Sequence, residues 1–161
     1  MNVAYLVLGG NLGDRESNIN SAEKLLLEHN IEIQSSSSVY ETAPWGMSES
    51  PDFLNKVIKI KTDKSAFQLI SVCLSIEQNF GRIRGDVGYK SRKMDIDILF
   101  FNDEVFNTAE LAIPHPRLHE RKFVLVPFDE IAPDYIHPVF RKSIRELLTE
   151  CRDLNQVKKY K

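Results

Sequence analysis

The 161-residue sequence has only two cysteines, Cys73 and Cys151, which lie far apart and outside any C-x-x-C spacing. This pattern offers neither a disulfide framework nor a cysteine-based metal site. The sequence also lacks an apolar run long enough to span a membrane, and the run over 3–8 is too short for the core of a signal peptide. We therefore expect a cytoplasmic protein without membrane contacts.

The chain also lacks a strong excess of charge of either sign. Its net charge is −2, and 42% of its residues are hydrophobic and 27% charged, which is ordinary for one globular domain. Nucleic-acid coats and membrane-surface proteins usually carry a strongly basic face, which this balance disfavours. We expect a single domain over residues 1–161, a monomer, with small-molecule substrates and no nucleic-acid partner.

Apolar periodicity predicts the order of strands and helices. Continuous apolar residues indicate a buried strand, alternation indicates a half-buried strand, and three-to-four-residue spacing indicates a helix. The expected elements are a strand over 3–8, a helix over 14–28 capped by Asp14, strands over 31–40 and 53–61, a helix over 65–81 capped by Ser65, and a strand over 94–101. This β-α-β-β-α-β order is typical of a ferredoxin-like α+β fold, an antiparallel sheet with two helices on one face. The other face is then left for a ligand.

The core of this fold is expected to end at residue 103. Residues 104–161 are proline-rich and contain one clear amphipathic helix, over 144–151, with too few apolar residues for a core of their own. We therefore expect a C-terminal extension that wraps the sheet. Its last residues, 152–161, carry several charges and should be loosely ordered.

Two carboxylates stand one residue apart in the apolar run over 94–101. Because side chains alternate along a strand, Asp95 and Asp97 point to one face and Ile96 to the other. Two like charges this close repel each other and are costly to desolvate. A hard cation such as Mg²⁺ neutralises the pair by binding both carboxylates together with substrate phosphates. The stretch over 82–93 has a net charge of +4, which suits those phosphates. The alternative is an edge strand whose solvated acids block aggregation.

The stretch over 9–14 lies between a strand and a helix but matches no nucleotide-binding glycine motif. We expect a tight turn with glycines at positive φ, tied together by the Asn11 side chain. Glu77 falls on the core-facing line of its helix, where a carboxylate needs a partner. An ion pair with Arg82 or Arg92 and a direct ligand contact both remain open.

A second group of residues suits a flat heterocycle. Phe53 and Asn55 share one face of their strand, beside a loop that carries Thr42, Pro44 and Trp45. An asparagine between aromatic rings can read the donor and acceptor edge of a heterocycle that stacks on them. The competing interpretation is that such aromatic residues belong to the core.

His115 lies between two prolines, which hold it in a rigid extended segment. Arg117, Arg121 and Lys122 follow closely, so this histidine suits a contact with a phosphate oxygen. Phe123 has the same two interpretations as Phe53, a ligand platform or a core residue.

Seven stretches together resemble the 6-hydroxymethyl-7,8-dihydropterin pyrophosphokinase family, folate-pathway enzymes that move pyrophosphate from ATP onto a pterin alcohol. These stretches, in the family's order, cover 9–14, 40–46, 51–55, 77–82, 92–99, 114–117 and 121–133. The resemblance implies the ferredoxin-like fold, ATP as co-substrate and AMP as the leaving group. It also implies two Mg²⁺ ions held by Asp95 and Asp97.

The resemblance further implies roles for individual residues. The implied catalytic residues are Asp95, Asp97, Arg82 and Arg92. The implied ATP site comprises Glu77, Arg82, Arg84, Tyr89, Arg92, Ile98, His115 and Arg121. The implied pterin site comprises Thr42, Pro44, Trp45, Phe53, Asn55, Asp95 and Phe123. Many family members have a basic residue followed by tryptophan where this chain has Gly88-Tyr89, so Tyr89 would supply the aromatic contact and Lys90 or Lys93 the charge.

Two other functions fit part of the pattern. One is a non-catalytic ferredoxin-like module that binds a small regulator or RNA, because this fold hosts many unrelated functions. The other is a metal-dependent nucleotidyl transferase or nuclease that uses the same two aspartates. The second would need an extended basic surface, which the net charge disfavours.

Overall fold

The structure is a computed structural model, and it describes residues 1–44, 51–81 and 92–161. Its strands are β1 (Asn2–Gly10), β2 (Glu32–Ser36), β3 (Tyr40–Thr42), β4 (Phe53–Thr62), β5 (Asp95–Phe101), β6 (Phe106–Asn107), β7 (Ala112–Ile113) and β8 (Val157–Lys159). Its helices are α1 (Arg15–Glu28), α2 (Ala66–Asn79), α3 (Lys122–Ile131) and α4 (Ile144–Glu150), and a 3-10 turn covers Leu118–Glu120.

The main sheet follows the predicted ferredoxin-like arrangement. Within the described residues it has six strands. Five of them follow the order β5-β1-β4-β3-β8, and the sixth, β2, also pairs with β4. β3 pairs with the start of β4, at 53–55, and β2 pairs with its later part, at 58–61. All the pairs are antiparallel. The chain order β1-α1-β2/β3-β4-α2-β5 is therefore the predicted β-α-β-β-α-β order, with the second strand divided in two.

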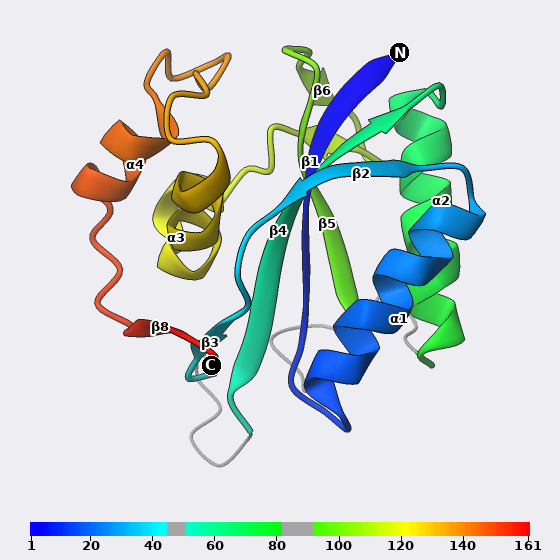
Figure 1. Ribbon diagram of the computed structural model, residues 1–161. Helices are drawn as coiled ribbons and strands as arrows, with labels where there is room; N and C mark the ends of the chain where they lie inside the picture. The colour runs from blue at the N-terminus through cyan, green and yellow to red at the C-terminus, as the bar shows by residue number, and fades with distance from the viewer. Residues whose placement is uncertain (45–50, 82–91) are drawn as a thin grey trace.

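The two predicted helix caps are present. Asp14 accepts a hydrogen bond from the Ser17 N–H at the start of α1. Ser65 and Gln68 form a reciprocal capping box at the start of α2. Both helices cover the same face of the sheet (Figure 1), where their apolar stripes join the first core. This core includes Leu6, Leu8, Ile19, Leu26, Leu69 and Ile76.

The second face of the sheet is not open along its whole length. Tyr5 and Val7 of β1 and Phe100 of β5 pack there against Phe128 of α3 and Leu147 of α4, forming a second core. Figure 1 shows α3 and α4 on the side opposite α1 and α2. The expectation that this face is left for ligand is therefore wrong for this part of the sheet. The continuous apolar run over 3–8 reflects a strand buried on both faces.

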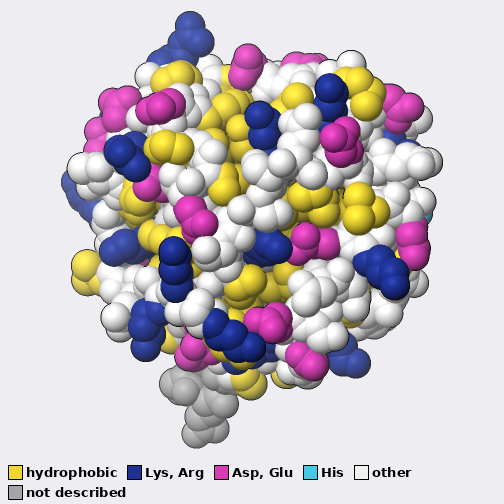
Figure 2. Space-filling view, in the orientation of Figure 1, with side chains coloured by type: hydrophobic (Ala, Val, Ile, Leu, Met, Phe, Trp, Pro, Cys, Tyr) yellow, Lys and Arg dark blue, Asp and Glu magenta, His cyan; other side chains and the backbone are white. Residues whose placement is uncertain are grey.

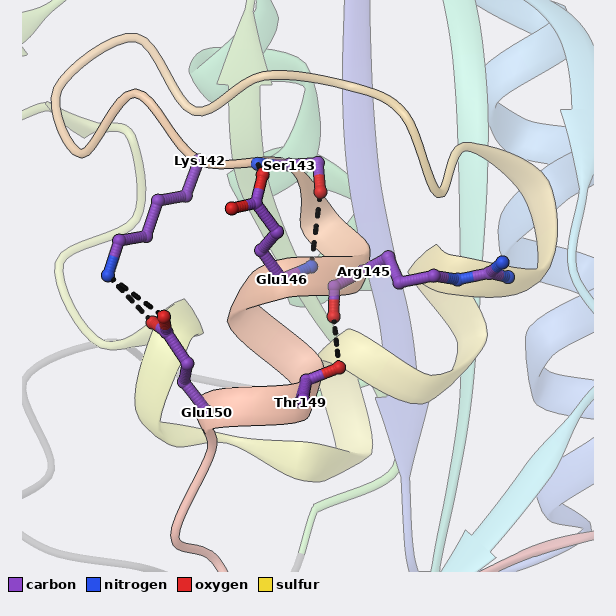
Figure 3. Close-up of polar contacts among 6 residues, drawn as sticks. All are labelled: Lys142, Ser143, Arg145, Glu146, Thr149 and Glu150. Atoms are coloured by element: carbon purple, nitrogen blue, oxygen red, sulfur yellow. Dashed lines mark hydrogen bonds and ion pairs between the residues drawn. The ribbon is translucent and has the colours of Figure 1, made fainter.

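The C-terminal extension wraps the sheet as expected, but it has two helices where the sequence predicted one. Pro127 lies inside α3, although proline is unfavourable within a helix because it lacks an N–H donor. The predicted helix, α4, begins at a capping box of Ser143 and Glu146 (Figure 3). Lys142, just before the helix, forms an ion pair with Glu150, its last residue.

The expectation of a loosely ordered tail over 152–161 is wrong. β8 pairs with β3, and the Tyr160 N–H donates to the Val39 carbonyl at 2.9 Å. The Arg15 guanidinium also lies 5.4 Å from the centre of the Tyr160 ring. The lysines that made this segment look disordered are common on exposed edge strands, where they discourage further pairing.

The serine run also differs from the continuous strand expected over 31–40. The strand breaks after β2, and Ser37 contacts β4 through its side chain. Its N–H donates to the Val57 carbonyl at 2.8 Å, and its Oγ accepts from the Val57 N–H at 3.0 Å. A hydroxyl oxygen thus replaces a main-chain acceptor at the break.

Charges of both signs are interspersed over the face of the molecule shown in Figure 2. Among the described residues, no helix is both long enough and apolar enough to cross a membrane. On the visible face, the mixed surface differs from the extended basic surface that nucleic-acid binding favours.

A buried histidine beside the second core makes the free energy of unfolding depend on pH. His137 is 3% exposed, and its ring contacts Phe100 edge-on and stacks on Phe140. Burial, and then the nearby charge of His119, lowers the pKa of His137 from 6.5 to about 4. Between these two values the unfolded chain takes up a proton that the folded protein does not bind.

The free energy of unfolding should therefore fall as the pH drops from 6.5 to 4, with up to about 3 kcal/mol of this fall due to His137. Urea unfolding at several pH values in this window would measure it. The control is His137→Asn, whose side-chain oxygen can accept the two N–H groups, of Val139 and Phe140, that donate to His137. An equally steep fall in the variant would contradict the role of His137.

Candidate active site

The register of three strands places two predicted site residues on either side of a glycine. Gly9 of β1 pairs with Asp95 of β5 and with Asn55 of β4. Residues paired directly across a sheet project to the same face, which here is the face opposite α1 and α2. A Cβ at Gly9 would clash with the Asn55 Oδ1. The amide of Asn55 therefore occupies the space that a side chain at position 9 would need.

The two aspartates project to this second face, as the sequence predicted. The Asp95 and Asp97 side chains are 28% and 23% exposed, whereas Ile96 is buried in the first core. The Arg92 Nη1 lies 3.4 Å from the Asp95 Oδ2, and the His115 Nε2 lies 4.0 Å from the Asp97 Oδ2. Each carboxylate thus has a basic side chain beside it and remains partly accessible to solvent.

Glu77 fixes the strand between the two aspartates. Among the described residues β5 lies at the edge of the sheet, and the Ile96 N–H donates to the Glu77 Oε2 at 2.8 Å. Glu77 is 1% exposed, so its carboxylate is buried against the strand that carries the site. The ATP contact inferred for Glu77 stays a prediction, and its possible partner Arg82 lies outside the described residues.

A bulge in β5 brings His115 to Asp97. The pairing of β5 with β1 shifts between Tyr5 and Leu6, which leaves Leu99 without a direct partner. The Leu99 carbonyl accepts the His115 N–H at 3.0 Å. The His115 Nδ1 accepts the Arg117 N–H at 3.2 Å, so the other ring nitrogen is the one that faces Asp97. Bulges often re-aim side chains in this way next to active sites.

The predicted pterin residues lie along the same face. Phe53 pairs with Thr42 and alternates with Asn55, so all three project together. Thr42 is 3% exposed, and its Oγ1 has no hydrogen-bond partner among the described residues. A buried hydroxyl without a partner is unusual and suits a site that meets a polar ligand. α3 packs on β3 and β4 and carries Phe123 in its first turn, with the Arg121 guanidinium 5.7 Å from that ring's centre.

Glu130 holds α3 over β3. Its carboxylate accepts the Tyr40 hydroxyl at 2.6 Å and also the N–H and hydroxyl of Ser38. Burial and then the Glu130 hydrogen bond raise the pKa of Tyr40 to about 12. Burial acts to raise the pKa of Glu130, but the hydrogen bonds from Tyr40 and Ser38 outweigh it, so that this pKa is lowered. Sequence reasoning missed this contact, although Glu130 falls in the last of the family-like stretches.

Some predicted site residues lie outside the described residues, and one has its side chain in the first core. Trp45, Arg82, Arg84, Tyr89 and Lys90 lie outside the described residues. Pro44 is described and partly exposed. Ile98 is 4% exposed and its side chain packs in the first core. Its predicted ATP contact would therefore be made by main-chain atoms.

The expected turn over 9–14 differs from the structure. Gly9 and Gly10 end β1, and the positive φ within the stretch, +73°, is at Gly13. Gly9 and Gly10 are needed for close approach instead, because a Cβ at Gly10 would clash with the Lys93 carbonyl. The positive φ expected of the glycines in this stretch is thus confirmed at Gly13, whereas Gly9 and Gly10 do not adopt it. Gly9 lets β1 approach Asn55, and Gly10 lets it approach the Lys93 carbonyl.

Gly9→Ala should therefore destabilise the protein by about 1–3 kcal/mol, because the new methyl group must displace the Asn55 side chain. Urea unfolding would measure the change. The matched control is Gly81→Ala, where φ is +84° and, among the described residues other than its chain neighbours, no atom lies within 4 Å of the added Cβ. This control should cost only about 1 kcal/mol, from backbone strain. A Gly9→Ala variant as stable as the wild type would contradict the close approach.

The sequence matches the family model described as 7,8-dihydro-6-hydroxymethylpterin-pyrophosphokinase (HPPK) over residues 5–133. A 2-amino-4-hydroxy-6-hydroxymethyldihydropteridine pyrophosphokinase from Bacillus subtilis (strain 168) is 44% identical over 131 residues, which cover 81% of this chain and 78% of that one. A protein of the same description from Aquifex aeolicus (strain VF5) is 42% identical over 151 residues, which cover 93% and 92%.

Solved structures show the same fold at lower identity. Plasmodium falciparum HPPK-DHPS with pteroate superposes with a TM-score of 0.74 at 19% identity. The match covers 92% of this chain but 42% of that one, so the chain spans less than half of that larger protein. The matches in sequence show that this chain belongs to the 7,8-dihydro-6-hydroxymethylpterin-pyrophosphokinase family.

Proposed function

We propose that the protein transfers pyrophosphate from ATP to the hydroxyl of 6-hydroxymethyl-7,8-dihydropterin and releases AMP. The observation that carries this proposal is the row of Asp95, Gly9 and Asn55 across three paired strands. It sets a carboxylate suited to cations beside an amide suited to a heterocycle edge. The glycine between them has no side chain, so the Asn55 amide can pack directly over β1.

The two carboxylates fit Mg²⁺ by their chemistry and their placement. Mg²⁺ binds oxygen, keeps several waters and uses one or two carboxylates together with substrate phosphates. Asp95 and Asp97 offer two such groups on one face, each partly exposed. We propose that they hold two Mg²⁺ ions, which would neutralise the phosphate oxygens of bound ATP.

Basic side chains around the aspartates would bind the rest of the triphosphate. Arg92 and His115 stand beside the carboxylates, and Arg121 precedes α3 on the same side of the sheet. Pyrophosphoryl transfer, like phosphoryl transfer, depends mainly on in-line positioning and on stabilising charge on oxygen. Arg82 and Arg84 keep their inferred roles in this proposal.

The pterin would lie on the sheet face beside β4. The Asn55 amide has both a donor and an acceptor for the heterocycle edge, and the Thr42 hydroxyl lacks a partner among the described residues. Phe53 and Phe123 would stack on the two sides of the ring. The pterin hydroxyl would then approach Asp95 and attack the β-phosphorus. The bond between the β-phosphorus and the oxygen that leaves with AMP would break, and we assign to Asp97 the task of orienting the hydroxyl and accepting its proton.

Product analysis tests this function. The protein is mixed with ATP, Mg²⁺ and the reduced pterin alcohol, and the nucleotide product is identified by chromatography. AMP should form in step with consumption of the pterin. Formation of ADP instead, or no turnover, would overturn the proposal.

Asp97→Asn should lower turnover by at least about 100-fold, because it removes a charged oxygen ligand without changing the shape of the side chain. Initial rates at saturating substrates would measure the loss, and circular dichroism would check the fold. Asp129→Asn is the control, since Asp129 pairs with Arg145 at the surface on α3. Turnover near the wild-type rate in Asp97→Asn would refute the role of this carboxylate.

A further inference from the structure

The Asn11 side chain leaves its own loop and joins two distant segments. Its Nδ2 donates to the Pro51 carbonyl at 3.1 Å, 40 residues away in sequence. Its Oδ1 accepts the Arg92 N–H at 2.9 Å, 81 residues away. Asn11 is 1% exposed and both bonds are partly buried, so losing them is costly.

The turn between β1 and α1 has other side chains to hold it. Asp14 caps α1 by accepting the Ser17 N–H. Asn18 donates to the Leu12 carbonyl at 3.1 Å and so closes the turn from the helix side. Local structure therefore gives no reason for the two long-range bonds of Asn11.

The two segments that Asn11 joins lead directly into the two halves of the site. Pro51 precedes β4, which begins at Phe53 and carries Asn55. Arg92 precedes β5, which begins at Asp95, and its guanidinium contacts that carboxylate.

The contact with Arg92 is reinforced by the main chain. The Asn11 and Leu12 N–H groups both donate to the Arg92 carbonyl, at 2.9 and 3.2 Å. Gly10 lets the chains approach, since a Cβ there would clash with the Lys93 carbonyl. On the Pro51 side, the Arg15 Nη1 donates to the Asp52 carbonyl at 2.8 Å.

We propose that Asn11 is a positioning residue that holds the pterin side and the metal side of the site in one fixed relation. This inference rests on the proposed function. The pterin hydroxyl must meet the β-phosphorus in line, and an error of about 1 Å in such an alignment can cost about 100-fold in rate. Asn11 sets this alignment by binding the entry to β4 and the entry to β5 with one rigid amide.

Three variants of the full chain test the proposal. Asn11→Ala removes both side-chain bonds and keeps the main-chain bonds to Arg92. Asn11→Asp, studied at pH 8, keeps an acceptor for the Arg92 N–H but has no donor for the Pro51 carbonyl. Asn18→Ala is the matched control, because it removes a bond of equal length, 3.1 Å, from the same turn.

Steady-state kinetics supply the first measurement. Asn11→Ala should lower kcat at least about tenfold, because alignment is lost even when both substrates are bound. Asn11→Asp should raise the KM for the pterin alcohol more than the KM for ATP, since it loses the bond to Pro51 and keeps the acceptor for the Arg92 N–H. Asn18→Ala should stay within about twofold of the wild type, although its stability falls as well.

Hydrogen exchange of the substrate-free protein supplies the second measurement. The Arg92 amide should exchange faster in Asn11→Ala and stay protected in Asn11→Asp and Asn18→Ala. Kinetics of Asn11→Ala that equal those of Asn18→Ala would overturn the proposal, as would an unchanged Arg92 amide. If the wild type forms no AMP, the proposed function fails instead, and the exchange result still decides whether Asn11 holds Arg92.

Discussion

The position of β1 between β4 and β5 is the constraint on which the site depends. The register of its two pairings sets Asp95, Gly9 and Asn55 in one row on one face. A shift by one residue in either pairing would turn Asp95 or Asn55, both predicted site residues, toward the first core. Burial on both faces of β1 makes such a shift costly, because Leu8 and Val7 pack into opposite cores. The strand pairing that forms the sheet thus also brings Asp95, Gly9 and Asn55 together.

Several contacts then fix the side chains around this row. Glu77 binds the outer N–H of Ile96, so that the edge strand carrying both aspartates is held by α2 as well as by β1. Glu130 holds α3 against β3 through Tyr40 and Ser38. Because α3 carries Phe123 near its start, this clamp also sets where that ring stands over the sheet. The carboxylates of Glu77 and Glu130 thus hold β5 and α3 in place around the row.

The parts of this structure that depend on local pattern were predicted from the sequence. Alternation alone placed Asp95 and Asp97 opposite Ile96, and short-range capping signals located α1 and α2. The parts that depend on contacts between distant segments were not. The covering of the second face by α3 and α4, the pairing of β8 with β3 and the partners of Asn11 all join residues far apart in sequence. A pattern within one segment cannot show which other segment will complete its hydrogen bonds.

We propose that the metal and the nucleotide bind on the second face, at the row formed by β4, β1 and β5. Nuclear magnetic resonance with Mn²⁺ and a non-hydrolysable ATP analogue tests this most directly, because the paramagnetic ion broadens signals only from nearby nuclei. The amide signals of Gly9, Asp95 and Asp97 should broaden, while those of Leu26 and Leu69 in the helices of the other face should stay sharp. Broadening centred elsewhere, or broadening that persists when both aspartates are replaced by asparagine, would contradict binding at this row.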